Sequence, residues 1–280
     1  MITILLLTKV RVAKNKFFSY RYHSRLKGAV IGLFLLSYLL GGYFFLHEGF
    51  QFILRFPFVG ALLLDRVVEL FFFALFVMLT TSHALFAYGA YFRSEETTFL
   101  RLLPIPLATL FAWEFWESIV LSSWTFLFVS IPMLIAYAQV RHIFASFVGL
   151  FLLLFLPLVI LSGVFGTFSI FFMVKVWRSK GRWVWLAGAA GIALALGLVT
   201  FSLRSTPTVQ PVMNQILDKL LWHTRFANWP CWPSQWVSRS LLSFIGGEFN
   251  RGLGYLWFGW ISALFFVQIL FYVGPSILHD

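Results

Sequence analysis

The segment IFASFVGLFLLLFLPLVILSGVFGTFSIFFMV, residues 143–174, contains no Asp, Glu, Lys or Arg. About 18 apolar residues are enough for a helix to cross the hydrocarbon core of a bilayer, and no soluble core needs an uninterrupted apolar segment of this length. Because backbone amides in hydrocarbon must be hydrogen-bonded within their own segment, such a segment crosses the membrane as an α-helix. The sequence therefore predicts an integral membrane protein.

The rest of the chain has the same apolar character. Of its 280 residues, 60% are apolar and only 11% are charged, whereas a soluble domain has about 25% charged residues. We predict an all-α fold with a six-helix transmembrane domain over residues 28–275 and an extracytoplasmic loop at 204–252. The predicted spans are residues 28–46, 67–92, 109–138, 143–174, 184–203 and 253–275.

The basic residues indicate how the chain is oriented. Seven of the 21 Lys and Arg residues precede the first span, in a basic amphipathic arm at residues 1–27 that suits an anionic membrane surface. In short segments, 13 Lys and Arg residues lie on the side of the N-terminus and 3 on the other side. The positive-inside rule therefore places the N-terminus in the cytoplasm. This placement argues against nucleic acid as a partner, although the net charge is +11.

Two local patterns concern the shape and packing of the predicted helices. Pro132 and Pro157 lie inside spans and are predicted kink sites, because proline removes a backbone donor and clashes with the preceding turn. In the fifth span, Ala189, Ala193 and Gly197 recur every four residues and would let another helix approach closely. The alternative for this second pattern is that alanine and glycine are simply common in membrane helices.

The loop before the last span contains a further helical pattern. Residues 235–245 place apolar side chains beside Ser238, Arg239 and Ser243, which predicts a short amphipathic helix at the outer interface. Four tryptophans, at positions 222, 229, 232 and 236, favour the headgroup zone of the membrane. We expect this loop to cap the membrane or to dip into it.

Residues that would indicate catalysis or ligand binding are sparse. There is one cysteine, and the six histidines show no metal-ligand spacing, so no metal site is predicted. The sequence contains neither a G-x-x-x-x-G-K-[ST] phosphate loop nor any Gly-Lys dipeptide. We therefore predict that this chain has no nucleotide-binding site, no cofactor and no enzymatic activity. Glu69, Glu114 and Glu117 lie near predicted span ends, where they would anchor the helices or, alternatively, take part in a proton relay.

The most informative segment is the predicted cytoplasmic loop YFRSEETTFLRLLPIP, residues 91–106. Ser94 can cap a short helix, two glutamates favour the positive end of its dipole, and Pro104 would stop it. The alternative is a plain turn between two membrane helices. On this helix, Phe99, Leu100 and Leu103 would form one apolar patch.

This loop, followed by a long helix from near Leu110, resembles the coupling-helix region of type-2 ATP-binding-cassette exporter permeases. The layout is similar too, with a basic amphipathic arm before the first span and outer helices between the fifth and sixth. Pro233, Ser234 and Trp236, with Gly246-Gly247 downstream, resemble the outer segment of exporters in this group. Leu161-Ser162-Gly163 resembles the start of a nucleotide-cassette signature, but it lies inside an apolar span and we interpret it as helix packing.

The resemblance implies partners and a location. The loop would dock onto a separate cytoplasmic ATPase subunit that holds ATP and Mg. The docking residues that the resemblance implies are Glu95, Glu96, Thr97, Phe99, Leu100, Leu103, Pro104 and Pro106. A second permease copy or a paralogue would complete the translocation path. The chain would be a multi-pass protein of the cytoplasmic (inner) membrane, as a half-length or truncated member of the group. The hypothesis from sequence is thus the permease subunit of an ATP-driven exporter of unknown substrate. The alternative is a membrane scaffold or anchor without transport activity, or a membrane-embedded enzyme that modifies lipids.

Overall fold

A computed structural model describes residues 25–57, 59–93, 106–143, 149–175 and 229–279. Every regular element in these ranges is a helix, which confirms the all-α fold class. The long helices are α2 (Arg25–Leu54), α3 (Gly60–Tyr88), α5 (Leu107–Val140), an unlabelled helix at Gly149–Lys175, and α9 (Phe249–His279). The short elements are a π-helical turn, η1 (Gly89–Arg93), directly after α3, and α8 (Pro233–Ile245).

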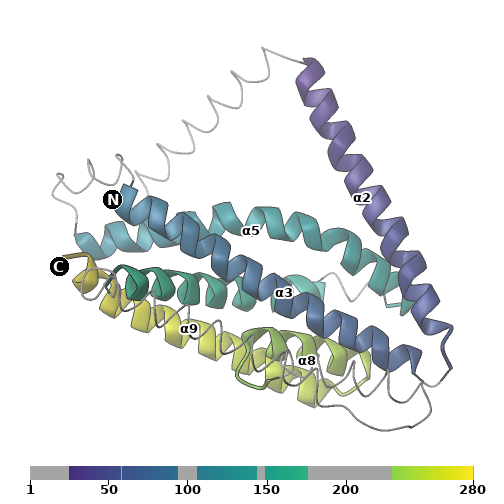
Figure 1. The fold of residues 1–280 in the computed structure, drawn as a ribbon. Helices are drawn as coiled ribbons and strands as arrows, with labels where there is room; N and C mark the ends of the chain where they lie inside the picture. The colour runs from purple at the N-terminus through teal and green to yellow at the C-terminus, as the bar shows by residue number, and fades with distance from the viewer. Residues whose placement is uncertain (1–24, 58, 94–105, 144–148, 176–228, 280) are drawn as a thin grey trace, which may run out of the picture.

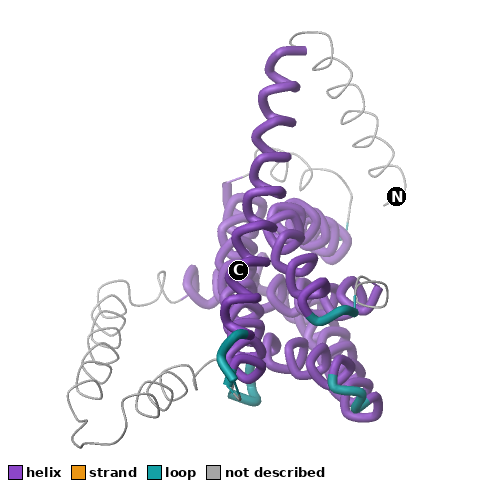
Figure 2. The backbone as a smooth tube through the Cα atoms, turned by 90° about the vertical axis from the view of Figure 1, so that its right-hand side faces the viewer, coloured by secondary structure: helices purple, strands orange, loops and turns teal. Residues whose placement is uncertain are grey.

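Four of the long helices form a bundle, and α2 leans away from it. Figure 1 shows α3, α5 and α9 running alongside one another, with α8 against the first half of α9. The turned view in Figure 2 shows the first half of α2 projecting from the rest. The contacts of α2 with α5 begin near its middle, where Tyr38 stacks on Phe128, and continue to the edge-to-face packing of Phe50 on Tyr137. The apolar side chains of its first half, including Leu33 and Phe34, are exposed.

The Gly149–Lys175 helix lies inside the bundle, and two glycines let it approach its neighbours. A Cβ added to Gly166 would lie 2.7 Å from the Thr80 carbonyl oxygen of α3. A Cβ on Gly163 would lie 3.0 Å from the Ile119 side chain of α5. Water does not drive helices together in hydrocarbon, so close packing at small residues is a main source of association there.

Three helices in the described ranges are long and apolar enough to cross a membrane: Lys27–Leu54, Gly149–Lys175 and Phe249–Pro275. A fourth is added if the two bent halves of α5 count as one span. The predicted number of six spans is therefore not confirmed. The predicted span 184–203 lies outside the described residues, and α3, which overlaps the predicted span 67–92, is not among these candidates.

Helix α5 is bent by 43° between Leu107–Trp124 and Phe126–Val140. The hydroxyls of Ser122 and Ser123 donate to the Ile119 carbonyl just before the bend, and such back-bonding by serine bends helices. Pro132, the predicted kink site, follows the bend and packs against Gly42 of α2. Pro157 lies within the Gly149–Lys175 helix, which has no break of this kind.

The predicted short helix near residues 235–245 is present as α8. It ends in a turn where Gly247 has φ of +78°, the Gly247 N–H donates to the Phe244 carbonyl, and the Glu248 N–H donates to the Ser243 carbonyl. Glycine adopts this left-handed conformation without steric cost, and the turn reverses the chain into α9. The face of α8 that is buried in the bundle is largely polar, with Ser234, Gln235, Ser238 and Ser240 beside Val237 and Leu241.

Candidate functional site

Most of the predicted site lies outside the described residues. This holds for Glu95, Glu96, Thr97, Phe99, Leu100, Leu103 and Pro104 of the loop, and for the predicted packing residues Ala189, Ala193 and Gly197. Pro106 is described: it is exposed and has extended backbone angles (φ −58°, ψ 130°) directly before the first residue of α5. The structure therefore describes the residues on either side of the predicted loop at 94–105, which are the end of η1 and the start of α5.

The two flanks of this loop are joined by one residue pair. The Tyr91 hydroxyl of η1 donates a hydrogen bond to the Phe111 carbonyl of α5 over 3.1 Å, and the two rings stack with centroids 5.1 Å apart. Both residues are buried. The π-helical turn holds Tyr91 at this position, and π-helical turns within or at the end of α-helices are often found at functional sites.

Phe171 and Phe271 join this pair in what we call the loop-base cluster, made of Tyr91, Phe111, Phe171 and Phe271. Phe171, near the end of the Gly149–Lys175 helix, lies 5.5 Å from Tyr91 between ring centroids, and Phe271 of α9 packs edge-to-face on Phe111 at 6.0 Å. The cluster therefore links η1 to three other helices at the base of the loop.

A glycine on α9 makes the cluster tight. A Cβ added to Gly274 would lie 2.3 Å from the Phe111 ring, closer than any real contact. Close-packed interiors transmit displacement because they have little free volume. A shift of Phe111 would consequently displace α9 as well as α5.

A second contact joins α3 to α5 deeper in the bundle. The Ser122 hydroxyl lies 2.7 Å from His83 Nδ1, and both side chains are fully buried. Gly166 packs against the His83 Cβ, so a third helix closes over this pair. Ionisable side chains inside membrane bundles are costly, and for that reason they mark functional positions more often than chance. The pair lies just before the bend of α5.

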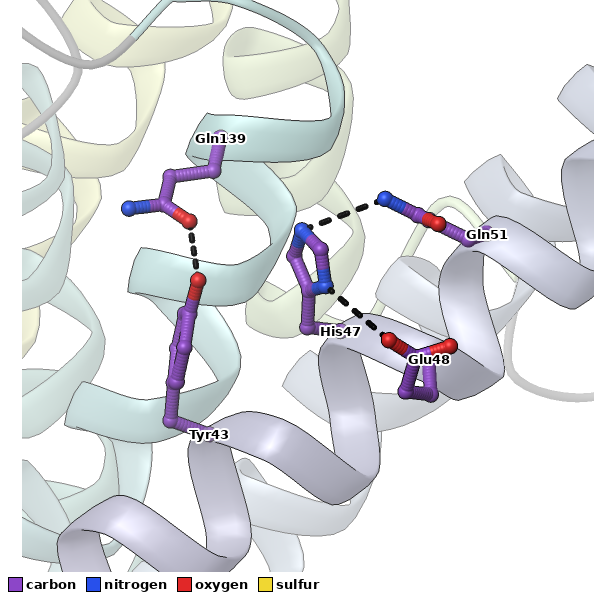
Figure 3. A network of polar contacts seen from close by, with 5 residues as sticks. All are labelled: Tyr43, His47, Glu48, Gln51 and Gln139. Atoms are coloured by element: carbon purple, nitrogen blue, oxygen red, sulfur yellow. Dashed lines mark hydrogen bonds and ion pairs between the residues drawn. The ribbon is translucent and has the colours of Figure 1, made fainter.

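The opposite end of the bundle has polar side chains around a pocket. A pocket of about 760 Å³ lies between the ends of α2 and α5. Figure 3 shows the polar side chains at this end: the Tyr43 hydroxyl donates to Gln139 Oε1, and His47 lies between Gln51 and Glu48, at 3.4 Å and 4.0 Å respectively. The lining residues are His47, Gln51, Leu54, Arg55, Ala138, Gln139, Val140 and His142.

The end of α5 positions one of these residues in an unusual conformation. His142 has φ of 58°, its N–H donates to the Gln139 carbonyl, and the Ile143 N–H donates to the Ala138 carbonyl. This is the hydrogen-bond pattern with which glycine commonly ends a helix. A histidine pays a steric cost in this conformation, so its imidazole is held at the pocket at the expense of stability.

Ion pairs tie the helices together at the same end. Arg141 at the end of α5 pairs with Asp65 of α3, and the Tyr137 hydroxyl donates to the same carboxylate over 3.5 Å. Within α3, Arg66 pairs with Glu69 over 2.7 Å. Two of the arginines predicted to lie on the outer side are thus partly neutralised by carboxylates. The ion pair of Glu69 with Arg66 is consistent with the anchoring role predicted for Glu69.

Sequence reasoning missed the Tyr91–Phe111 pair, the His83–Ser122 pair and the polar pocket. A signal for His83 was available, since a histidine inside an apolar span is rare. Nothing in the sequence distinguishes Phe111 from the other 35 phenylalanines. The pocket depends on the angle between α2 and α5, which no local pattern encodes.

The model of one protein family, described as "Putative ATP-binding cassette", matches residues 19–278. No curated protein and no solved structure matches the chain. The match supports an association with ATP-binding-cassette transporters, which is the broader part of the sequence hypothesis. The match does not by itself establish the permease role or the specific partners.

The match corrects the prediction that this chain has no nucleotide-binding site, no enzymatic role and no cofactor. The family is described as an ATP-binding cassette, which implies that ATP binds to this chain, so the prediction of ATP and Mg on a partner subunit alone is wrong. The prediction rested on the missing phosphate loop, and one missing motif cannot exclude other modes of binding.

The residues that the structure describes do not themselves fit a nucleotide. Leu161-Ser162-Gly163 is buried in the bundle, where the Ser162 hydroxyl donates to the Val159 carbonyl over 2.8 Å. None of the described helices begins at a glycine-rich loop with a lysine that could hold phosphates. The family match nevertheless covers nearly the whole length of the chain, and on that basis the chain belongs to the family described as "Putative ATP-binding cassette".

Proposed function

We propose that this chain forms the membrane-spanning, substrate-moving part of an ATP-binding-cassette exporter. The loop-base cluster is the observation on which the proposal rests, because it joins the two flanks of the predicted loop at 94–105 to each other and to two further helices of the bundle. The family match and the apolar helices supply the context in which such a cluster has a mechanical use.

Force on the loop would reach the helices at a fixed point. The loop leaves η1 two residues after Tyr91 and enters α5 four residues before Phe111. The stacking and the hydrogen bond between these residues hold the two flanks together, and Gly274 leaves the Phe111 ring no room to move independently of α9. The loop would therefore act on α3, α5 and α9 together.

A displacement of α5 would be absorbed at the bend of this helix. The bend at Trp124–Phe126 divides α5 into a half that contains the loop-base cluster and a half that lines the polar pocket. The His83–Ser122 pair fixes α5 to α3 just before that bend. A movement at the loop would change the angle at the bend and so alter the pocket between α2 and α5, some distance from the ATPase.

The proposal includes the partners and the orientation. An ATP-hydrolysing domain would dock on Glu95, Glu96, Thr97, Phe99, Leu100, Leu103, Pro104 and Pro106, and a second copy of the chain or a paralogue would complete the path, with the fifth predicted span packing through Ala189, Ala193 and Gly197. The N-terminus and the loop would face the cytoplasm, in the cytoplasmic membrane, as the positive-inside rule favours.

A matched pair of substitutions tests the docking part of the proposal. Leu103→Asp places a charge on the proposed docking surface, and Phe56→Asp places the same charge on an exposed phenylalanine of the α2–α3 connection at the opposite end. After purification from membranes in mild detergent, the wild-type chain and Phe56→Asp should retain a nucleotide-binding protein at constant stoichiometry, whereas Leu103→Asp should lose it while still inserting into the membrane.

Labelling with a photoreactive ATP analogue adds a second readout to the same preparations. It identifies which chain holds the nucleotide, including this one, as the family description implies. Equal retention of the partner by both aspartate variants would refute docking through the loop. A preparation that shows neither a retained partner nor ATP hydrolysis would favour a scaffold or a lipid-modifying enzyme.

A further inference from the structure

A second pocket, of about 570 Å³, lies between α8 and the first turns of α9. We call it the α8–α9 pocket. Its described lining consists of Pro230, Gln235, Trp236, Arg239, Arg251, Gly254, Tyr255 and Phe258, which include two guanidinium groups and no carboxylate. Its size lies within the range of about 300–1,000 Å³ that is typical of small-molecule sites.

Arg239 is the cation without a counter-charge. Among the described residues its polar contact is with the Tyr255 hydroxyl, which its guanidinium reaches at 3.5 Å, and no carboxylate lies within ion-pair distance of it. Arg251, in contrast, pairs with Glu248 over 2.8 Å. A half-buried cation without an anion is costly unless a ligand supplies one.

Gln235 is the second polar group that lacks a partner. It lies one turn before Arg239 on the same face of α8, its side chain is 1% exposed, and neither its amide nitrogen nor its amide oxygen has a hydrogen-bond partner in the described part of the chain. A buried amide of this kind normally finds a partner. A small rotation of the side chain toward the pocket would let a ligand hydroxyl or ester oxygen satisfy it.

The apolar surroundings place this polar pocket at the level of lipid headgroups. The candidate span Phe249–Pro275 begins at the pocket, and Trp236 packs edge-to-face on Phe258 with ring centroids 4.6 Å apart. Trp and Tyr favour the membrane interface. Below the pocket, Phe258, Ile261 and Phe265 form an exposed apolar stripe along α9, at the spacing of one helix face. A ligand with an anionic head and an acyl chain matches both the polar pocket and the apolar stripe.

We infer that the α8–α9 pocket binds an anionic phospholipid of the surrounding leaflet. Its phosphate lies against Arg239 and Arg251, its polar ester region faces Gln235, and one acyl chain follows Phe258, Ile261 and Phe265. Guanidinium groups bind phosphate through paired hydrogen bonds. The inference does not depend on the export function proposed above, since a lipid site of this kind is compatible with any role of the chain in the membrane.

The single cysteine of the chain provides a reporter. Cys231 is exposed and directly follows Pro230, which lines the pocket. A fluorophore on Cys231 of the full chain, reconstituted in phosphatidylcholine nanodiscs, should be quenched more strongly by spin-labelled phosphatidylglycerol than by spin-labelled phosphatidylcholine. Arg239→Gln should lower the apparent affinity for phosphatidylglycerol about tenfold, the size expected from the loss of one charge-assisted contact.

Two further variants separate the site from general charge effects. Gly254→Leu should fill the pocket and abolish the preference, and it is compatible with the fold because a Cβ at Gly254 meets nothing within 4 Å. Arg55→Gln, which makes the same change of charge outside the α8–α9 pocket, should leave the preference intact. Equal quenching by the two lipids in the wild-type chain would overturn the inference, as would equal affinities in Arg239→Gln and Arg55→Gln.

Inorganic phosphate distinguishes a lipid from a free anion. If phosphate added to the nanodiscs does not reduce the quenching by phosphatidylglycerol, the acyl chain contributes to binding as inferred. Displacement of phosphatidylglycerol by inorganic phosphate would show that the pocket takes a soluble phosphate, and the lipid inference would then be wrong.

Discussion

The two ends of the bundle are built from different chemistry. At the loop end, aromatic rings join the helices, with Tyr91 stacked on Phe111, Phe271 edge-to-face on Phe111, and Gly274 close to the Phe111 ring. At the other end, polar groups join the helices beside apolar contacts, with the Arg141–Asp65 ion pair and a pocket whose lining includes histidine and amide side chains. Under the proposed function, the aromatic end would transmit movement and the polar end would adapt to it.

The largest effect should come from overpacking the aromatic end. Gly274→Ala adds a methyl group where the Phe111 ring already lies within 2.3 Å of the Cβ position, and overpacking of a dense core costs about 1–3 kcal/mol. Gly41→Ala is the matched control, because a Cβ there meets nothing within 4 Å. Thermal unfolding in detergent should show a lower midpoint for Gly274→Ala alone. Similar midpoints for both variants would mean that the cluster is loosely packed.

A smaller effect is expected from removal of the hydrogen bond within the cluster. Tyr91→Phe keeps the ring stacking and loses the donor to the Phe111 carbonyl. A buried hydrogen bond of this kind contributes about 1 kcal/mol, and because it is buried the loss should not change with salt concentration. Denaturation at low and high ionic strength measures both the loss of stability and its dependence on salt. A strong dependence on salt would show that the base of the loop is open to solvent.

The smallest effect is expected at the polar end. Asp65→Asn removes the partner of Arg141, but both side chains are partly exposed, and exposed ion pairs contribute about 0.2–1 kcal/mol. The loss should shrink as salt is added, unlike that of Tyr91→Phe. A double-mutant cycle of Asp65→Asn with Arg141→Gln isolates the coupling between the two charges. A coupling that is unaffected by salt would contradict the contrast between the ends.

The class of the fold followed from the sequence, whereas the arrangement of the helices did not. The absence of charge in residues 143–174 and the pattern of residues 235–245 were sufficient for the all-α fold and for α8. The bend in α5 was expected at Pro132 and occurs near Ser122 and Ser123, because hydrogen bonds from serine side chains to the backbone depend on rotamers that the sequence does not specify.

The site was harder to predict than the fold. Motif reasoning singled out residues 95–106, of which only Pro106 is among the described residues. It could not identify the Tyr91–Phe111 pair that joins the two flanks, since that pairing requires a π-helical turn and a glycine on α9. The prediction of no nucleotide in this chain failed because it treated one missing phosphate loop as decisive. Gln235 was read as part of an amphipathic surface helix, whereas it is buried without a partner in the described structure.

The most direct test of the account is a crosslink from the loop itself. In a chain with Cys231→Ser, a cysteine introduced by Phe99→Cys can be linked in intact membranes to a neighbouring protein, which mass spectrometry then identifies. The account predicts a crosslink to a nucleotide-binding protein from position 99, and none from the matched Phe56→Cys variant at the opposite end. A crosslink to that protein from position 56, or the absence of one from position 99, would contradict the role of the loop as the point where ATP-driven movement enters the membrane helices.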